Sequence, residues 1–413
     1  GIKEVVSVPV IHAQNIKDPT QANRILEGGY VDLVGMTRAH IADPHLIAKI
    51  KMGQVDQIRQ CVGANYCIDR QYQGLDVLCI QNAATSREYM GLPHVISQSE
   101  GRRRRAVVVG GGPGGMEAAR VLAERGHEVT LFEAEDSLGG QITLAARAPS
   151  RDQIAGITRW YQLELARLKV DLRLGTRADV PTIDDLRPDL VVLATGGRPF
   201  LDQYADWGFD PDPEKSLVVS TWDILSGKVA PGQNVLVFDS ICEFSGVSAA
   251  DFLADKGARV EIVTDDIKPG AAVGGTTFPT YYRSLYEKEV IMTSDLMLHE
   301  VYREGASLVA VLENEYSGVQ EERVVDQIVV ENGVRPDERL YLEMKEASLN
   351  RGQVDLEALY AARPQPCLAY LDGEGRSAGD RSAGFVLFRL GDGVAPRNVH
   401  AAIYDALRLC KDV

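Results

Sequence analysis

The glycine-rich turn at residues 110–115 most constrains how this chain can fold. In RAVVVGGGPGGMEAARVLAERGHEVTLFEAE (105–135), an apolar run precedes the turn and a helix-forming stretch follows it. Glycines at this spacing permit a tight turn, let a pyrophosphate approach the main chain, and let helix and strand pack closely. The pattern predicts a strand–helix–strand unit that binds a dinucleotide. The glycines of the turn that we predict to bind the nucleotide are Gly110, Gly112, Gly114 and Gly115.

An acidic residue stands at the end of the second predicted strand. Glu133 follows Gly115 by 18 residues. A carboxylate at this place accepts hydrogen bonds from a ribose 2′-hydroxyl. The free N–H groups at the start of the preceding helix attract the phosphates. Glycine turn, helix and acid together therefore predict an adenine-dinucleotide site.

Three further glycine motifs favour FAD over NAD at this site. They are LGGQ (138–141), ATGG (194–197) at the end of a predicted buried strand, and GDG (391–393) before a C-terminal helix. The set resembles that of flavoprotein reductases with two dinucleotide-binding domains. The resemblance implies that Asp392 contacts the flavin ribityl chain. The further predicted nucleotide-binding residues are Gly140, Gln141, Thr195, Gly196 and Asp392.

A second strand–helix–strand pattern at 233–266 repeats the first without its fingerprint. Between strand and helix it reads DSICEFSG, with Asp239 where the first glycine belongs and only Gly246 retained. A carboxylate there repels a pyrophosphate, and bulky side chains block its approach. We expect poor NAD(P)H binding in this second domain. Residues 301–333 alternate apolar and polar side chains and predict a β-hairpin or meander, and 372–384 predicts a mobile loop.

The N-terminal region predicts two successive strand–helix units. VPVIHAQNI (8–16) reads as a buried strand in which His12 packs, and 18–29 as a helix. Residues 31–53 repeat the plan as a strand, a polar loop and a helix started by proline. The chain starts at Gly1 in what reads as the middle of an element. We therefore expect it to be the C-terminal part of a longer protein.

Three cysteines bunch between residues 61 and 79. Cys61, Cys67 and Cys79 have the short spacings of an iron–sulfur loop, but Ala64 stands where a fourth thiolate is expected. A cluster with fewer cysteine ligands and three structural thiols both remain open. The other three cysteines, at 242, 367 and 410, read as buried small side chains.

Net charge and hydropathy exclude several classes of partner. The net charge of −15 argues against nucleic acid or an anionic membrane surface. No apolar run reaches the length that spans a membrane. The irregular cysteine positions fit a reducing, cytoplasmic compartment better than a disulfide framework.

The cysteine loop CVGANYCIDR…CIQNAATSRE resembles that of the trimethylamine dehydrogenase and 2,4-dienoyl-CoA reductase family. Upstream, VDLVGMTRAHIADPHL resembles the last strand and phosphate loop of its old-yellow-enzyme-type barrel. The resemblance covers the whole chain. It implies an iron–sulfur cluster at Cys61, Cys67 and Cys79, and FAD or ADP in the middle domain. Barrels of this type bind phosphate after strands 7 and 8, which implies an FMN phosphate site at Asn15, Thr37 and Arg38.

The predicted fold class is α/β: the end of a (β/α)8 barrel followed by two Rossmann-like dinucleotide-binding domains. Catalytic residues are expected in the earlier barrel strands, which this chain does not contain. The predicted domains are the barrel end (1–58), the cysteine loop and linker (59–100), the first part of the FAD/ADP domain (101–228), a degenerate NAD(P)-type domain (229–330) and the return to the FAD domain (331–413).

The resemblance is closest to the members that demethylate N-methyl amines and amino acids. It implies an FMN/FAD-dependent oxidoreductase whose substrate is a small methylated amine and whose electrons pass from FMN through the cluster to an electron-transfer flavoprotein. One alternative is an NADPH-dependent 2,4-dienoyl-CoA reductase-like enzyme. A second is a dinucleotide-binding fragment without activity of its own. The oligomeric state, including a homo-oligomer, stays open.

Overall fold

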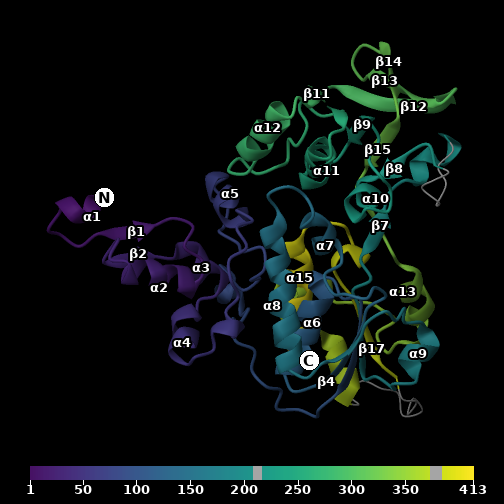
Figure 1. The fold of residues 1–413 in the computed structure, drawn as a ribbon. Helices are drawn as coiled ribbons and strands as arrows, with labels where there is room; N and C mark the ends of the chain where they lie inside the picture. Colours follow the sequence, from purple (N-terminus) through teal and green to yellow (C-terminus); the bar gives the residue numbers. More distant parts are fainter. Residues whose placement is uncertain (208–215, 373–383) are drawn as a thin grey trace. The chain divides into compact units, whose positions relative to one another are not determined.

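The computed structural model describes residues 1–207, 216–372 and 384–413, and most of the predicted mobile loop at 372–384 lies outside this range. The chain forms a mixed α/β fold that divides into two compact units. Unit 1 holds residues 1–140, 154–196 and 336–413, and unit 2 holds residues 141–153 and 197–335. Figure 1 shows the elements of both units along the chain.

The N-terminal part of unit 1 contains two parallel strands, each followed by helices. Asp18 caps α2 by accepting a hydrogen bond from the Gln21 main-chain N–H at 2.9 Å. One small core, with Ile16, Met36 and Leu46 at its centre, packs these elements together. The elements are β1 (Ile11–Ala13), α2 (Pro19–Glu27), β2 (Leu33–Gly35), α3 (Thr37–Ala42) and α4 (Leu46–Lys51).

Two sequence expectations for this part are wrong. Strand β1 is exposed rather than buried, and His12 within it is exposed as well. A parallel strand is buried only where other layers cover both faces of its sheet, and every residue of β1 is exposed. The expected polar loop before Pro44 contains a helix, α3, whose Ala39 and Ala42 are buried, so a second helix precedes the one that proline starts.

The larger part of unit 1 is a five-stranded parallel sheet in the order β17-β6-β3-β4-β5. Strand β3 pairs with both β4 and β6, so it lies at the sheet centre. The predicted unit at 105–135 is confirmed, as are the strand ending at Leu193 and the C-terminal helix. The strands are β3 (Arg105–Val109), β4 (Glu128–Phe132), β5 (Asp171–Arg173), β6 (Leu190–Leu193) and β17 (Val386–Arg389).

Helices cover both faces of this sheet. Alternate strand residues such as Val107 and Val191 form a core with Ile183 of α9 and Leu340 of α13. On the other face α6 packs between α8 and α15, as Figure 1 shows. The helices are α6 (Pro113–Glu124), α8 (Gly156–Arg167), α9 (Val180–Asp184), α13 (Arg339–Met344) and α15 (Val399–Cys410).

Unit 2 contains a second five-stranded parallel sheet, in the order β11-β10-β9-β15-β8. The predicted strand–helix–strand pattern at 233–266 is confirmed as β9, α11 and β10. One face of the sheet packs on α10, α11 and α12. The elements are β8 (Val219–Ser220), α10 (Thr221–Ser226), β9 (Asn234–Asp239), α11 (Phe244–Asp255), β10 (Arg259–Val263), α12 (Phe278–Glu287), β11 (Ile291–Thr293) and β15 (Gln327–Glu331).

A three-stranded antiparallel sheet packs on the other face of the unit 2 sheet. It forms from β12 (Leu296–Glu304), β13 (Ser307–Asn314) and β14 (Gln320–Val325), which confirms the predicted meander for most of its length. The exception is β15, which leaves the meander and pairs in parallel with β9. Its run of buried residues, Ile328 to Glu331, is typical of a parallel strand covered on both faces.

Candidate functional site

The predicted nucleotide turn lies in unit 1 between β3 and α6, and its glycines are required by close approach. An added Cβ at Gly110 would overlap the carbonyl of Ala194, and one at Gly115 would overlap the carbonyl oxygen of Gly110. Gly110 also has a φ of 106°, which favours glycine. Gly114 allows α6 to pack closely on Ala402 of α15. Three of the four glycines therefore shape the turn.

Gly112 differs from the other glycines because an added Cβ there would meet no atom within 4 Å. It precedes α6 directly, so the open space faces the unpaired N–H groups of the first helical turn. Gly140 lies beside it, with its Cβ position 3.2 Å from the Gly112 Cα. This is the bare main chain that a pyrophosphate needs, and the turn fits the ADP part of a dinucleotide.

Glu133 follows directly after β4 and its carboxylate faces the turn. One carboxylate oxygen accepts the Gly111 N–H at 2.6 Å, and the other accepts the Glu135 N–H at 2.8 Å. A carboxylate oxygen has more than one acceptor site. Glu133 therefore supports the turn and keeps acceptor capacity for a ribose hydroxyl.

The remaining predicted nucleotide residues lie at the ends of other elements. Thr195 follows β6, and its hydroxyl donates to the Asp337 carbonyl at 2.8 Å. Gly393 lies beside Thr195, so the 391–393 turn and the 194–196 turn are adjacent. Asp392 accepts the Arg397 N–H at 3.2 Å. Gln141 begins the short helix α7 (Gln141–Ala145), which belongs to unit 2.

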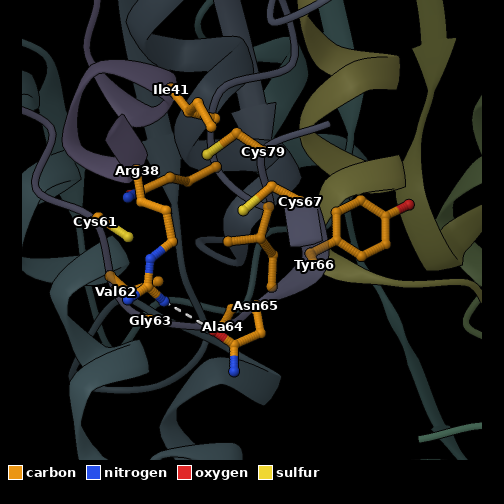
Figure 2. Close-up of a pocket in the computed structure, with 12 residues that line it drawn as sticks. Arg38, Ile41, Cys61, Val62, Gly63, Ala64, Asn65, Tyr66, Cys67 and Cys79 are labelled. Carbon is orange, nitrogen blue, oxygen red and sulfur yellow. Dashed lines mark hydrogen bonds between the residues drawn. The ribbon is translucent and has the colours of Figure 1, made fainter. Parts of the chain in front are cut away.

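The three clustered cysteines line one pocket in unit 1. The pocket is lined by Cys61, Cys67, Cys79, Ala64 and Arg38. Figure 2 shows the three sulfur atoms around the same space, with the Arg38 guanidinium beside them. Burial raises the pKa of Cys79 to about 11, and burial together with nearby Cys61 raises the pKa of Cys67.

The arrangement of these thiols limits what metal the pocket can hold. Ala64 supplies no ligand at the fourth place. Within residues 1–207, 216–372 and 384–413, no group of three His, Cys, Asp or Glu side chains is set to hold a metal ion. The thiols as arranged therefore do not fit the four-thiolate set of a regular [4Fe–4S] cluster.

Arg38, which belongs to the predicted phosphate loop, lines the cysteine pocket. Its guanidinium donates to Asn65 Oδ1 at 2.9 Å. Asn65 has a φ of 59°, in the left-handed region that asparagine tolerates. The other two predicted FMN residues, Asn15 and Thr37, are exposed near the ends of β1 and β2. The sequence pointed to Arg38 but gave no signal for its partner Asn65.

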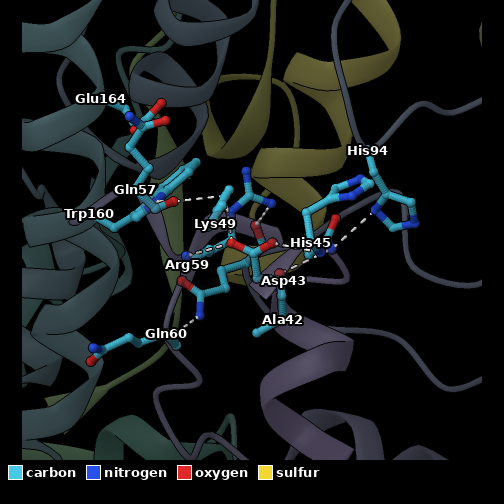
Figure 3. A network of polar contacts seen from close by, with 12 residues as sticks. Ala42, Asp43, His45, Lys49, Gln57, Arg59, Gln60, His94, Trp160 and Glu164 are labelled. Carbon is cyan, nitrogen blue, oxygen red and sulfur yellow. Dashed lines mark hydrogen bonds and ion pairs between the residues drawn. The ribbon is translucent and has the colours of Figure 1, made fainter. Parts of the chain in front are cut away.

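A polar network holds the segment that precedes Cys61 in place (Figure 3). Asp43 accepts hydrogen bonds from Lys49 Nζ at 2.6 Å and from the Arg59 N–H at 2.9 Å. Burial opposes ionisation of Asp43, but these hydrogen bonds outweigh it and lower its pKa. Lys49 and Trp160 both donate to the Gln57 carbonyl. The segment before Cys61 is thereby held to α4 and α8.

Two more contacts of this network join the two halves of the cysteine loop. Arg59 donates to the Gln81 carbonyl at 3.1 Å, and its guanidinium stacks on Trp160 at 4.0 Å. The Gln81 amide donates to the Gln60 carbonyl at 2.5 Å. The chain before Cys61 and the chain after Cys79 therefore run side by side. The three isolated cysteines, Cys242, Cys367 and Cys410, are buried as expected.

Unit 2 carries a buried acidic pair where a dinucleotide fold binds its ligand. Asp239 ends β9 and Glu331 ends β15, and the two are register partners. Asp239 is fully buried, accepts the Cys242 N–H at 2.9 Å, and has one carboxylate oxygen without a partner. Burial and the nearby Glu331 carboxylate raise the pKa of Asp239 to about 7.

No helix among the described residues is long and apolar enough to cross a membrane.

Comparison with known proteins places this architecture in a family. Residues 104–361 match the pyridine nucleotide-disulphide oxidoreductase model, and residues 1–57 match the NADH:flavin oxidoreductase / NADH oxidase family. A 2-naphthoyl-CoA reductase structure covers the whole chain with a TM-score of 0.81 at 23% identity, and the chain covers 55% of that structure. At this identity the likeness shows the fold alone.

Two curated relatives match the entire chain. An N,N-dimethylglycine/sarcosine dehydrogenase of Chromohalobacter salexigens is 82% identical over 412 residues, and a "Probable N-methylproline demethylase" of Rhizobium meliloti is 42% identical. The chain spans 58% of the length of each. These names confirm the predicted resemblance to demethylating flavin enzymes. The chain belongs to the pyridine nucleotide-disulphide oxidoreductase family.

Proposed function

We propose that this chain is the C-terminal, electron-transfer portion of a flavin-dependent oxidoreductase that demethylates a small N-methylated amine or amino acid. The observation that carries the proposal is the 82% identity, over the whole chain, to an N,N-dimethylglycine/sarcosine dehydrogenase. The 42% identity to a protein named as an N-methylproline demethylase supports the same class of substrate. The domain boundaries drawn from the sequence, including a barrel end at 1–58, are part of the proposal.

The nucleotide in unit 1 is proposed to be FAD or ADP. Its pyrophosphate would lie on the main chain of Gly110, Gly112 and the start of α6, with the ribose at Glu133. The other residues of the proposed site lie in turns of the same unit: Gly140, Thr195, Gly196 and Asp392. Gln141 directly follows Gly140 and is proposed with them. A bound flavin supplies the acceptor chemistry for hydride, while these residues bind and orient the nucleotide.

The FMN and cluster sites are further parts of the proposal. Asn15, Thr37 and Arg38 are proposed for the FMN phosphate, although Arg38 is engaged by Asn65. Cys61, Cys67 and Cys79 are proposed as cluster ligands because they share one pocket. Ala64 restricts any cluster there to three cysteine ligands. Iron and acid-labile sulfide analysis of anaerobically purified protein tests this part, and absence of both would remove the cluster from the proposal.

The proposed electron acceptor is an electron-transfer flavoprotein in the cytoplasm, and not a pyridine nucleotide. The support is local to unit 2. The segment from Asp239 to Gly246 is two residues longer than the segment from Gly110 to Gly115, and it begins with Asp239 in place of glycine. A buried carboxylate at this place opposes a pyrophosphate. This argues against the alternative NADPH-dependent reductase.

Turnover by the complete gene product that carries this chain tests the proposal. We expect N,N-dimethylglycine or sarcosine to reduce its flavin anaerobically, and NADPH to leave the flavin oxidised on the same time scale. The flavin absorbance at about 450 nm decreases on reduction, so it reports the response to the methylated amine and to NADPH. Rapid reduction by NADPH with no response to methylated amines would replace this proposal by the reductase alternative. Bound nucleotide without flavin reduction by either methylated amines or NADPH would favour the dinucleotide-binding fragment without activity of its own.

A further inference from the structure

A buried histidine on α15 contacts residues that line the cysteine pocket. His400 is 3% exposed, and its Nδ1 lies 2.6 Å from the carbonyl oxygen of Cys79. Its Nε2 lies 2.6 Å from a guanidinium nitrogen of Arg87. Both ring nitrogens of His400 are therefore engaged.

The partners of His400 determine its tautomer. A guanidinium has only donors, so Arg87 must donate and Nε2 must accept. The ring proton then lies on Nδ1, which donates to the Cys79 carbonyl. Arg87 is itself held in place, because its guanidinium stacks on Tyr404 at 4.0 Å, one helical turn after His400. The hydrogen bonds from Arg87 to His400 and from His400 to the Cys79 carbonyl thus run in a single direction, and the Tyr404 ring supports Arg87 by a cation–π contact.

His400 touches both halves of the cysteine loop. Its ring centroid lies 5.3 Å from that of Tyr66, the residue between Asn65 and Cys67. Tyr66 lines the pocket together with Cys67, as Figure 2 shows. One side chain therefore contacts the segment that carries Cys67 and the segment that carries Cys79, although these thiols are twelve residues apart.

The helix that carries His400 also supports the nucleotide turn. Ala402 of α15 packs against Gly114 of α6 and against Gly391 of the Gly-Asp turn. Asn398 caps α15 by accepting the Ala401 N–H at 2.9 Å, which fixes where the helix begins. The same two turns of α15 thus contact the proposed nucleotide site and the cysteine pocket.

We propose that His400 is a positioning residue that holds Cys79 in the cysteine pocket through its Nδ1–H, with Arg87 fixing the tautomer, and that α15 links this pocket to the nucleotide turn. The inference rests on the proposed function only for the claim that the pocket is a functional site. The hydrogen bond orients the main chain at Cys79, so its loss frees the thiol to leave the pocket. The proposed role of His400 is to bind the Cys79 carbonyl oxygen and not the Cys79 sulfur.

Two substitutions separate hydrogen bonding from packing. His400→Asn keeps an N–H close to the place of Nδ1, whereas His400→Gln places its amide near Nε2 and cannot serve the Cys79 carbonyl. The readout is alkylation of Cys79 by iodoacetamide in the full chain, followed by mass spectrometry of its peptide. Cys410, fully buried on the same helix, reports any general loosening of α15. Tyr404→Phe keeps the aromatic ring and is the matched control.

We expect His400→Gln to speed Cys79 alkylation about tenfold, the effect of losing one buried hydrogen bond, while His400→Asn and Tyr404→Phe stay near the parent rate. Cys410 should remain unreactive in all of them. Equal rates for His400→Asn and His400→Gln would overturn the positioning role. So would a parallel rise at Cys410, because that is general unfolding.

The link through α15 has its own measurement. Saturating ADP should slow Cys79 alkylation in the parent chain and have a smaller effect in His400→Gln. ADP that binds without slowing Cys79 in the parent chain overturns the link. ADP that does not bind at all contradicts the proposed nucleotide site instead, and the comparison of His400→Asn with His400→Gln still decides the positioning role.

Discussion

The carboxylate of Asp239 lies against Gly246, at the position where a Cβ atom of residue 246 would lie. A Cβ added to Gly246 would overlap the Asp239 carboxyl group, so only glycine fits at this position of α11. The pair joins the end of β9 to the first turn of the following helix. In unit 1 the corresponding contact is between Gly110 and Gly115, and it involves main chain alone. Unit 2 therefore fills with a side chain the place that main chain fills in unit 1.

Replacing Gly246 by alanine should destabilise unit 2. The added methyl group must displace the Asp239 carboxylate, which would then lose its hydrogen bonds from the Ile241 and Cys242 N–H groups. We expect a loss of about 2–4 kcal/mol in the free energy of unfolding, typical of overpacking combined with lost buried hydrogen bonds. Urea unfolding followed by circular dichroism measures it.

A double-mutant cycle checks that this loss comes from the contact with Asp239. Asp239→Ala removes the carboxylate, so adding Gly246→Ala to it should cost at least about 1 kcal/mol less than in the parent. Strict additivity of the two changes would show that the carboxylate does not press on residue 246.

The stability of unit 2 should fall as pH rises toward neutrality because of Asp239. Burial raises its folded-state pKa to about 7, from an ordinary value of 3.8. Between these two pH values the folded state binds more protons than the unfolded state. The contribution of Asp239 to stability is therefore largest below about pH 4 and declines as the pH rises to about 7. The difference amounts to at most about 4 kcal/mol.

The variant Asp239→Asn removes this titration, so comparing it with the parent measures the contribution of Asp239 to the pH dependence of stability. The variant should show a flatter dependence of unfolding free energy on pH between 5 and 8, and it should be more stable than the parent at pH 8. Glu331, whose pKa is also raised by burial, remains in both proteins and adds a common slope. An unchanged pH dependence in the variant would place the titrating group elsewhere.

Gly112→Ala should weaken nucleotide binding without disturbing the fold. The added methyl group meets no protein atom, and Gly112 has a φ of −72° that alanine adopts freely. It does occupy the space through which a pyrophosphate approaches the main chain. We expect ADP affinity to drop about tenfold or more, by calorimetry, at an almost unchanged melting temperature.

Gly115→Ala is the contrasting variant. Its methyl group would overlap the Gly110 carbonyl oxygen, so the whole turn must shift. Stability and ADP affinity should both decline, with the unfolding free energy lower by about 2–4 kcal/mol. Parent-like ADP affinity in Gly112→Ala would mean that the phosphates lie away from this turn.

Ala64→Cys should raise the iron content of the protein. Ala64 lines the pocket that Cys61, Cys67 and Cys79 share, so a thiol there supplies the missing fourth ligand. Iron and acid-labile sulfide per chain after anaerobic reconstitution measure the effect. Ala48→Cys, on the exposed face of α4, adds a thiol away from the pocket and should leave iron unchanged. Equal iron in both variants would count against a cluster at these thiols.

The sequence alone determined the elements whose chemistry is local. The glycine turn at 110–115, the helix within 18–29 and the strand–helix–strand units of both sheets depend on residues a few positions apart. Dihedral freedom, capping and periodicity act over that range, so their patterns can be recognised in one dimension. The substitution of Asp239 for glycine was visible in the same way.

Only the tertiary structure decided which of these residues meet. It paired Arg38 with Asn65, left β1 exposed, and placed β15 in the parallel sheet and not in the meander. It also joined His400 to the Cys79 carbonyl across 321 residues of chain. Such contacts arise because buried surfaces pack and buried polar groups must find partners, and no local sequence pattern records which distant residue becomes the partner.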